Sequence, residues 1–231
     1  EIHHGGDNSA RWHGMYISSP NNLIKNCRIH DNSGYGIHIY GGVADNTAVI
    51  GNTIYGNGWS TKCGISCWGL LLGGGADMIA YNNVIYNNQA GVQTGFGAVN
   101  PLIYNNTVYN NNLSGQRTTT LDVGSNTSGL IVRNNIMYLP GGDPNNQISN
   151  EGTSVITQSN NLFTDPFFVN PTSNDYHLQS NSPAIDAGVD LSSVFTTDFD
   201  GISRPQGLAY DIGAYEYGSG GTPAPVVTIS A

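Results

Sequence analysis

The chain has 231 residues, of which 38% are hydrophobic, enough to bury the core of one domain or of an elongated repeat array. Only 10% of the residues are charged, whereas 31 are glycine and 29 are asparagine, so turns are expected and a helical fold is not. The formal net charge of −9, with only seven lysines and arginines, argues against a nucleic-acid partner, and the lack of any apolar run of about 18 residues argues against a membrane span.

A phrase of asparagine, aliphatic and tyrosine residues repeats along the chain. "YNNVIYNN" (81–88) returns as "YNNTVYNNN" (104–112), and weaker copies recur every 23 to 31 residues. The residues that close the successive copies are His3, His30, Tyr55, Tyr86, Tyr109, Tyr138 and Thr164. A period of this length is typical of a solenoid, in which each unit buries its apolar face only against its neighbours.

Two inward-facing columns precede this closing residue. The residue one position before it is apolar in every copy, which predicts a core position. The residue three positions before it shares that face on a strand with period two. This column comprises Cys27, Asn52, Asn83, Asn106, Asn135 and Asn161. Because strands stack about 4.8 Å apart, such amides can hydrogen-bond one another, and we predict an internal asparagine ladder.

A corner lies between this column and the strand before it. The residue six positions before the closing residue is again apolar, so the inward positions are six, three and one before it. The alternation of a single strand cannot place all three on one face, so it must be interrupted between positions six and three. The change falls on residue types that tolerate a left-handed backbone, namely Asn26, Gly51, Asn82, Asn105, Asn134 and Asn160. We therefore predict a corner at these residues, and we expect the tyrosines that close the repeats to face outward and stack as a scaffold.

A third strand in each repeat begins with glycine and alternates. The copies are "GMYIS" from Gly14, "GIHIY" from Gly36, "GISCW" from Gly64, "GVQTG" from Gly91 and, less clearly, "TLDVG" from Thr120. In the third copy, Ile65 and Cys67 would face inward. Three short parallel strands per coil and about six coils predict an all-β fold, a parallel β-helix, because a propeller would need periods nearer 40 residues.

The chain divides into three predicted parts. Residues 1–164 form the coils, and because the first residues already read as the middle of a repeat, we expect further coils before them. Residues 165–217 are expected to cap the end of the helix, where unpaired strand edges need cover, with an ion pair from Arg204 to Asp211 or Glu216. Residues 218–231 have the composition of a Gly/Pro linker toward a further region.

The three cysteines, Cys27, Cys63 and Cys67, do not have the spacing of a metal site. We expect them to be small buried core residues. One disulfide that involves Cys63 or Cys67 is the alternative.

Several segments resemble a known superfamily. "NNLIKNCRIHDNSGYGIHIY" (21–40) and "LIYNNTVYNNN" (102–112) resemble the repeats of right-handed parallel β-helix proteins, a superfamily that contains pectate lyases, other polysaccharide lyases and glycosidases. "LFTDPFFVN" (162–170), "DYHLQSNSPAIDAG" (175–188) and "DFDGISRPQGLAYDIGAYEY" (198–217) resemble the closing segment of secreted bacterial members, which often precedes a surface anchor. The resemblance implies a right-handed helix, an extracellular location, a polysaccharide partner and attachment to the cell surface through a C-terminal region. It does not specify the activity, because one fold hosts many chemistries.

In the resembled enzymes the substrate groove commonly lies along the sheet of glycine-led strands. The outward columns predicted on that sheet are Tyr16, His38, Ser66, Gln93 and Asp122, followed by Ser18, Tyr40 and Trp68. Aromatic rings stack on sugars and polar groups bond their hydroxyls. The same columns also fit an ordinary solvated face, since tyrosine is a good strand former.

Two kinds of carbohydrate chemistry compete at this predicted groove. In β-elimination, His38, Tyr16 and Tyr40 could exchange protons beside Arg11 and His13 of the loop "SARWHG", although the net charge of −9 disfavours a polyanionic substrate. Hydrolysis of a glycoside requires two carboxylates, and Asp122 alone is predicted on the sheet. The predicted catalytic residues are His38, Tyr16, Tyr40 and Asp122, and the predicted substrate-binding residues are Trp68, Gln93, Ser66, Arg11 and His13.

Two groups of side chains, the early histidines and the aspartates of "DFDG", are candidates for metal binding. His3 and His4, with His30 one coil later, suggest a metal site, but the closing column of the repeat explains His3 and His30, and no metal site is predicted. Asp198 and Asp200 in "DFDG" could bind Ca²⁺, although the rest of a calcium loop is missing. Two functions therefore stand: a secreted protein that binds, and could cleave, a polysaccharide as a lyase or glycosidase, and a non-catalytic cell-surface spacer or adhesin.

Overall fold

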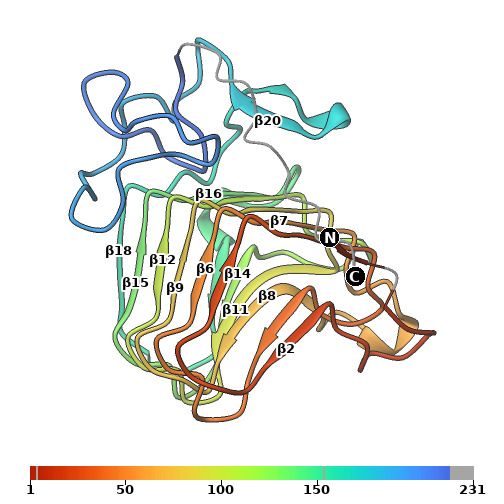
Figure 1. Cartoon of the computed structure of the whole chain (residues 1–231). Helices are drawn as coiled ribbons and strands as arrows, with labels where there is room; N and C mark the ends of the chain where they lie inside the picture. Colours follow the sequence, from red (N-terminus) through yellow and green to blue (C-terminus); the bar gives the residue numbers. More distant parts are fainter. Residues whose placement is uncertain (4, 153, 219–231) are drawn as a thin grey trace.

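The computed structural model describes residues 1–3, 5–152 and 154–218 (Figure 1). Three parallel sheets of six strands wind around one core, so the chain is an all-β, right-handed parallel β-helix of about six coils, as predicted. In the described part of the chain, the helices are single turns of three residues, η1 (Thr61–Cys63), η2 (Pro144–Asn146) and η3 (Pro171–Ser173). No helix there is long enough to cross a membrane.

Each coil contributes one strand to each sheet. Sheet A contains β1 (Ile2–His3), β4 (Arg28–His30), β7 (Thr53–Tyr55), β10 (Val84–Tyr86), β13 (Thr107–Tyr109) and β16 (Ile136–Tyr138). Sheet B contains β2 (Met15–Ile17), β5 (Ile37–Ile39), β8 (Trp68–Gly73), β11 (Ala90–Gly95), β14 (Leu121–Val123) and β17 (Ile148–Asn150). Sheet C contains β3 (Leu23–Lys25), β6 (Ala48–Ile50), β9 (Ile79–Tyr81), β12 (Leu102–Tyr104), β15 (Leu130–Arg133) and β18 (Ile156–Ser159).

The predicted asparagine ladder runs through the core. Nδ2 of Asn52 donates to Oδ1 of Asn83 (2.9 Å), and the same bond continues from Asn83 to Asn106 (2.9 Å) and from Asn106 to Asn135 (3.0 Å). Each Oδ1 also accepts the backbone N–H of the ladder residue one coil earlier. The buried amides are therefore paired, which removes the usual penalty of placing them in a core.

A second, unpredicted ladder lies two residues after the closing aromatic. Nδ2 of Asn32 donates to Oδ1 of Asn57 (2.8 Å), and the bond repeats from Asn57 to Asn88 (2.9 Å) and from Asn88 to Asn111 (2.8 Å). This ladder, with neighbouring backbone and isoleucine atoms, leaves no room for a side chain at Gly36, which precedes β5, or at Gly69, the second residue of β8. A Cβ on Gly36 would lie 2.9 Å from Nδ2 of Asn57, and one on Gly69 would lie 2.7 Å from Nδ2 of Asn88.

The corner residues adopt the predicted left-handed backbone. The φ angles are 53° at Asn26, 61° at Gly51, 52° at Asn82, 46° at Asn105, 55° at Asn134 and 51° at Asn160. The closing aromatics face outward and partly stack, with ring centroids 4.6 Å apart for His30 and Tyr55 and 5.0 Å apart for Tyr55 and Tyr86. Tyr176, which lies outside the coils, packs against Tyr86 and Tyr109, so the scaffold is continued by the following segment.

The third glycine-led strand differs from the prediction. β8 starts at Trp68 rather than Gly64, and Leu70 rather than Ile65 pairs with Ile37. Ile65 is 41% exposed instead of facing the core. Cys63 and Cys67 are both buried, as predicted, and they form a disulfide with each other (Cα–Cα 5.3 Å), so the disulfide alternative holds for this pair. The disulfide closes a loop that precedes the strand.

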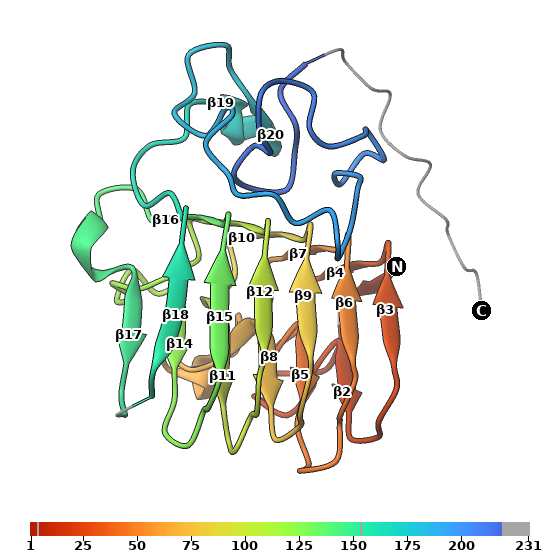
Figure 2. The same ribbon diagram turned by 90° about the vertical axis from the view of Figure 1, so that its left-hand side faces the viewer.

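The segment from 165 to 217, which includes β19 (Phe168–Asn170) and β20 (Asp175–Leu178), lies along the side of the coils (Figure 2). Side-chain amides of the corner row donate to its backbone: Asn82 to Thr197, Asn105 to Asp211 and Asn134 to Val189. These contacts span several coils, whereas a cap over the helix end was expected. The boundaries of the predicted parts stay predictions, and within the predicted linker residues 219–231 lie outside the described residues.

Buried charges hold this lateral segment together. Nη1 of Arg204 lies 2.7 Å from Oε1 of Glu216, and both side chains are fully buried, which confirms the predicted ion pair with Glu216 as the partner. Asp198 accepts backbone N–H groups of Asp200, Ile202 and Glu216 through its two carboxylate oxygens. Asp200 pairs with His177 at 2.8 Å. Asp198 and Asp200, the calcium candidates, are thus engaged within the segment.

Candidate functional site

The exposed part of sheet B carries a cluster of aromatic and histidine side chains around β2 and β5. We call it the β2–β5 face, and its members are His13, Tyr16, Tyr35, His38, Tyr40 and Phe96. Tyr16 and His38 are register partners, with rings 5.1 Å apart. Tyr40 and Phe96 meet edge to face at 5.0 Å. Tyr16, Tyr40 and Phe96 are 53%, 38% and 55% exposed, so the cluster offers open ring surface to a ligand.

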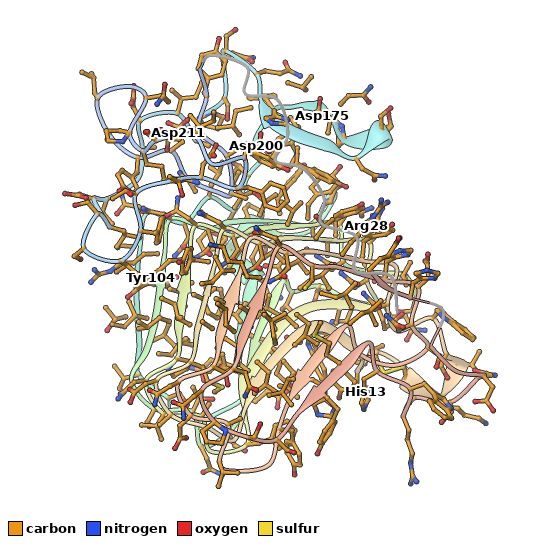
Figure 3. The ribbon with its side chains drawn as sticks, in the orientation of Figure 1. His13, Arg28, Tyr104, Asp175, Asp200 and Asp211 are labelled. Atoms are coloured by element: carbon orange, nitrogen blue, oxygen red, sulfur yellow. A yellow bond between two sulfur atoms is a disulfide. The ribbon has the colours of Figure 1, made fainter. Side chains whose placement is uncertain are left out.

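A backbone amide determines which ring nitrogen carries the proton in each of the two neutral histidines of this face. The N–H of Tyr35 donates to Nδ1 of His13 (3.1 Å), so this nitrogen accepts and carries no proton. The proton of neutral His13 is then on Nε2, which lies 3.0 Å from Nδ1 of His38 and donates to it. His38 therefore carries its own proton on Nε2, where the described residues provide no partner. His13 is labelled beside β2 in Figure 3.

The surroundings keep both imidazoles neutral. Burial lowers the pKa of His13. Burial, and next the repulsion from His13, lowers the pKa of His38 to about 4. At neutral pH the β2–β5 face consequently presents an uncharged N–H donor among aromatic rings, and neither histidine supplies a positive charge.

The middle of sheet B is covered by a second, buried cluster. Nε1 of Trp68 donates to Oδ2 of Asp122 (2.7 Å), and the hydroxyl of Thr119 donates to Oδ1 (2.7 Å). The guanidinium of Arg117 pairs with the same carboxylate and lies over the Trp68 ring at 5.8 Å. Both oxygens of Asp122 are therefore engaged, and the segment that carries Arg117 closes this part of the predicted groove.

Comparisons with known proteins agree with this architecture. A family model described as a right-handed β-helix region matches residues 1–71. The crystal structure of pectate lyase Pel9A matches over 93% of this chain and 57% of that chain, with 19% identity and a TM-score of 0.53. The fold is that of the pectate-lyase-like β-helix proteins. The chain spans 57% of the length of this lyase.

A second solved structure matches less closely. The A-module of the mannuronan C-5 epimerase AlgE4 from Azotobacter vinelandii is 19% identical over 66% of this chain and 48% of that chain, with a TM-score of 0.37. No curated protein matches the sequence. At 19% identity the likeness to the pectate lyase concerns the fold alone.

The structure separates the predicted site residues into three groups. His13, Tyr16, His38 and Tyr40 meet on the β2–β5 face. Trp68 and Asp122 meet in the covered cluster, and Gln93, which pairs with Leu71 in the register, is buried near the same strands. Ser66 and Arg11 are not on the sheet.

Ser66 was misplaced by the register of the third coil. Its backbone N–H bonds the carbonyl of Cys63 in the disulfide loop, and Leu71 occupies the outward position assigned to it. Arg11 lies exposed in the segment before β2, where its backbone N–H contacts Ser9 Oγ.

The sequence did not predict three neighbours of the candidate site residues, Tyr35, Phe96 and Arg117. Tyr35 directly precedes Gly36, and Phe96 directly follows β11, so both lie just outside the alternating outward columns of the glycine-led strands. Arg117 comes from a segment between strands, where periodicity gives no signal. On the β2–β5 face the described residues include no group of three metal-ligating side chains.

Proposed function

We propose that this β-helix binds an extracellular polysaccharide on the β2–β5 face. The proposal is supported mainly by three exposed rings, Tyr16, Tyr40 and Phe96, which lie beside the outward N–H donor of His38. Aromatic rings stack against the C–H faces of sugars, and a neutral donor suits hydroxyl and ring oxygens. The likeness in fold to a pectate lyase supports a polysaccharide as the ligand class.

An uncharged stretch of polysaccharide fits this face better than a polyuronate. Recognition of a uronate needs a cation near its carboxylate. His13 and His38 are neutral, and the nearby guanidinium of Arg117 is buried against Asp122. The net charge of −9 adds a general repulsion of polyanions.

The same contacts limit which residues could assist cleavage. Nδ1 of His38 is occupied by His13 and Nε2 carries the proton, so His38 can donate a proton but is not set up as a base. Asp122 is covered and engaged at both oxygens. Tyr16, His38 and Tyr40 are the groups placed to exchange protons with a bound sugar, and Asp122 would act by positioning Trp68 and Arg117.

Secretion is part of the proposal. The Cys63–Cys67 disulfide suits an oxidising compartment outside the cytosol. Attachment to the cell surface through a C-terminal region stays the prediction made from the sequence.

One observation favours the alternative of a non-catalytic spacer or adhesin. The cluster around Trp68 and Asp122 closes the middle of sheet B, which shortens the groove to the β2–β5 face. Two asparagine ladders along the core would make such a rod stiff. The spacer function predicts that no polysaccharide binds at this face.

The test is a binding titration of the purified chain against soluble neutral and uronic polysaccharides, with Tyr16→Ala and Tyr40→Ala as variants. Loss of one stacked ring, worth about 1.4 kcal/mol, weakens binding about tenfold. Tyr217→Ala is the matched control, because Tyr217 is also about 41% exposed but lies in the lateral segment. Equal affinity of all three variants, or no binding to any polysaccharide, refutes the proposal and leaves the spacer function.

A further inference from the structure

The first two members of the aromatic column bring metal-ligating groups together far from the β2–β5 face. His3 of β1 and His30 of β4 are register partners in sheet A, with rings 4.9 Å apart and inclined by 14°. Oε1 of Glu1 lies 2.7 Å from Nε2 of His30. One ligand atom each from Glu1, His3 and His30 lies within 4.8 Å of the other two.

His30 is held in a fixed orientation within this group. Its ring stacks on Tyr55 with centroids 4.6 Å apart and planes inclined by 2°. Its Nδ1 lies 2.8 Å from Oδ2 of Asp31. A carboxylate that accepts from one imidazole nitrogen directs the lone pair of the other nitrogen outward, and this arrangement commonly stands behind histidines that bind metals.

We propose that Glu1, His3 and His30 bind a zinc-type transition-metal ion, with Asp31 as the positioning carboxylate. Two imidazole nitrogens and one carboxylate oxygen are a ligand set that zinc accepts, and a fourth position stays open to water. The metal–ligand bonds of about 2.1 Å separate neighbouring ligands by roughly 3.4 Å, so Glu1 must retreat slightly and His3 must tilt. Both side chains are exposed, whereas His30 is buried.

Such an ion would join strand β1 to strand β4. The described pairing of β1 with β4 consists of two residue pairs, Ile2 with Ile29 and His3 with His30. A ligand that binds only the folded chain stabilises it. Metal binding should therefore raise the melting temperature of the protein, and chelation should reverse the increase.

The test uses Zn²⁺ in competition with a chromophoric chelator and Co²⁺ as a visible probe of coordination. We expect one Zn²⁺ per chain with a dissociation constant on the order of micromolar. His30→Gln should weaken binding at least tenfold, and Asp31→Asn about tenfold, the usual effect of removing a carboxylate behind a ligand. His177→Gln is the control, because His177 also contacts two carboxylates but has no second histidine beside it in the described structure.

A chemical control separates this site from simple chelation by the terminus. An amino group at Glu1 can itself bind a metal together with His3, so the titration is repeated on chain acetylated at that group. Binding that survives acetylation and falls in His30→Gln supports the proposal. Zn²⁺ affinity that is unchanged in His30→Gln, that disappears on acetylation, or that is absent from the parent chain overturns it.

Discussion

Replacing Asn106 by alanine tests whether the internal ladder holds the coils together. Oδ1 of Asn106 accepts two hydrogen bonds from Asn83, one from the backbone N–H (3.0 Å) and one from the side-chain Nδ2 (2.9 Å). Nδ2 of Asn106 donates to the carbonyls of Ala80 and Tyr104 and to Oδ1 of Asn135. Asn106→Ala removes all five bonds in a region closed to water.

The expected loss follows from the groups left without partners. A buried polar group without a partner costs about 1–3 kcal/mol, and the carbonyls and Asn135 can keep other partners. The backbone N–H and one amide hydrogen of Asn83 then dominate, which gives a loss of about 2–6 kcal/mol in the free energy of unfolding. This is a large part of the stability of an ordinary domain.

Urea denaturation followed by circular dichroism measures the loss directly. Asn145→Ala is the control, because Asn145 is exposed and bonds only its neighbour Asp143. Asn161→Ala, at the half-buried end of the ladder, should cost less than Asn106→Ala. If Asn106→Ala costs less than about 1 kcal/mol, or no more than Asn145→Ala, the ladder does not stabilise the coils as argued.

Two further predictions concern the lateral segment. Glu216→Ala leaves the buried guanidinium of Arg204 without its carboxylate partner and should destabilise the segment by about 3–5 kcal/mol. Hydrogen exchange of the segment measures this loss, and Glu151→Ala, at an exposed position, should leave the exchange unchanged. Equal exchange in both variants contradicts the prediction. The hydrogen bond to Asp200 raises the pKa of His177 to about 9, so its stabilisation is present below about pH 6.5 and is lost as the pH rises through 9. Melting temperatures from pH 6 to about 10 should fall more steeply in the parent chain than in His177→Gln, and parallel curves would refute the assignment.

Much of the fold could be predicted because it repeats. The columns of Asn83 and Asn106, and the corner at Asn105, follow from a constraint that every coil must satisfy again. The third glycine-led strand was misplaced because "GISCW" imitates the pattern of "GIHIY" in a loop that occurs once. That loop is closed by the Cys63–Cys67 disulfide, and only coordinates show where it rejoins the sheet.

The site was harder to predict than the coils. Tyr16 and His38 were found because alternation places both on the outer face of sheet B. The contact of His13 with His38 depends on how the segment before β2 folds back, and the cover over Trp68 depends on Arg117, which is distant in sequence. The lateral position of residues 165–217 was not predicted, because the pattern of the corner asparagines indicates only a turn. It does not show that their side-chain amides donate hydrogen bonds to a later segment of the chain.

The two ladders are separated by five residues in three successive coils, from Asn52 to Asn57, from Asn83 to Asn88 and from Asn106 to Asn111. This segment between the two ladder residues has a constant length, whereas the coils themselves vary from 23 to 31 residues. Insertions and deletions can therefore accumulate in the remaining arcs without disturbing the stack. A chain built in this way can exchange its surface loops, and with them its ligands, while its axis stays the same.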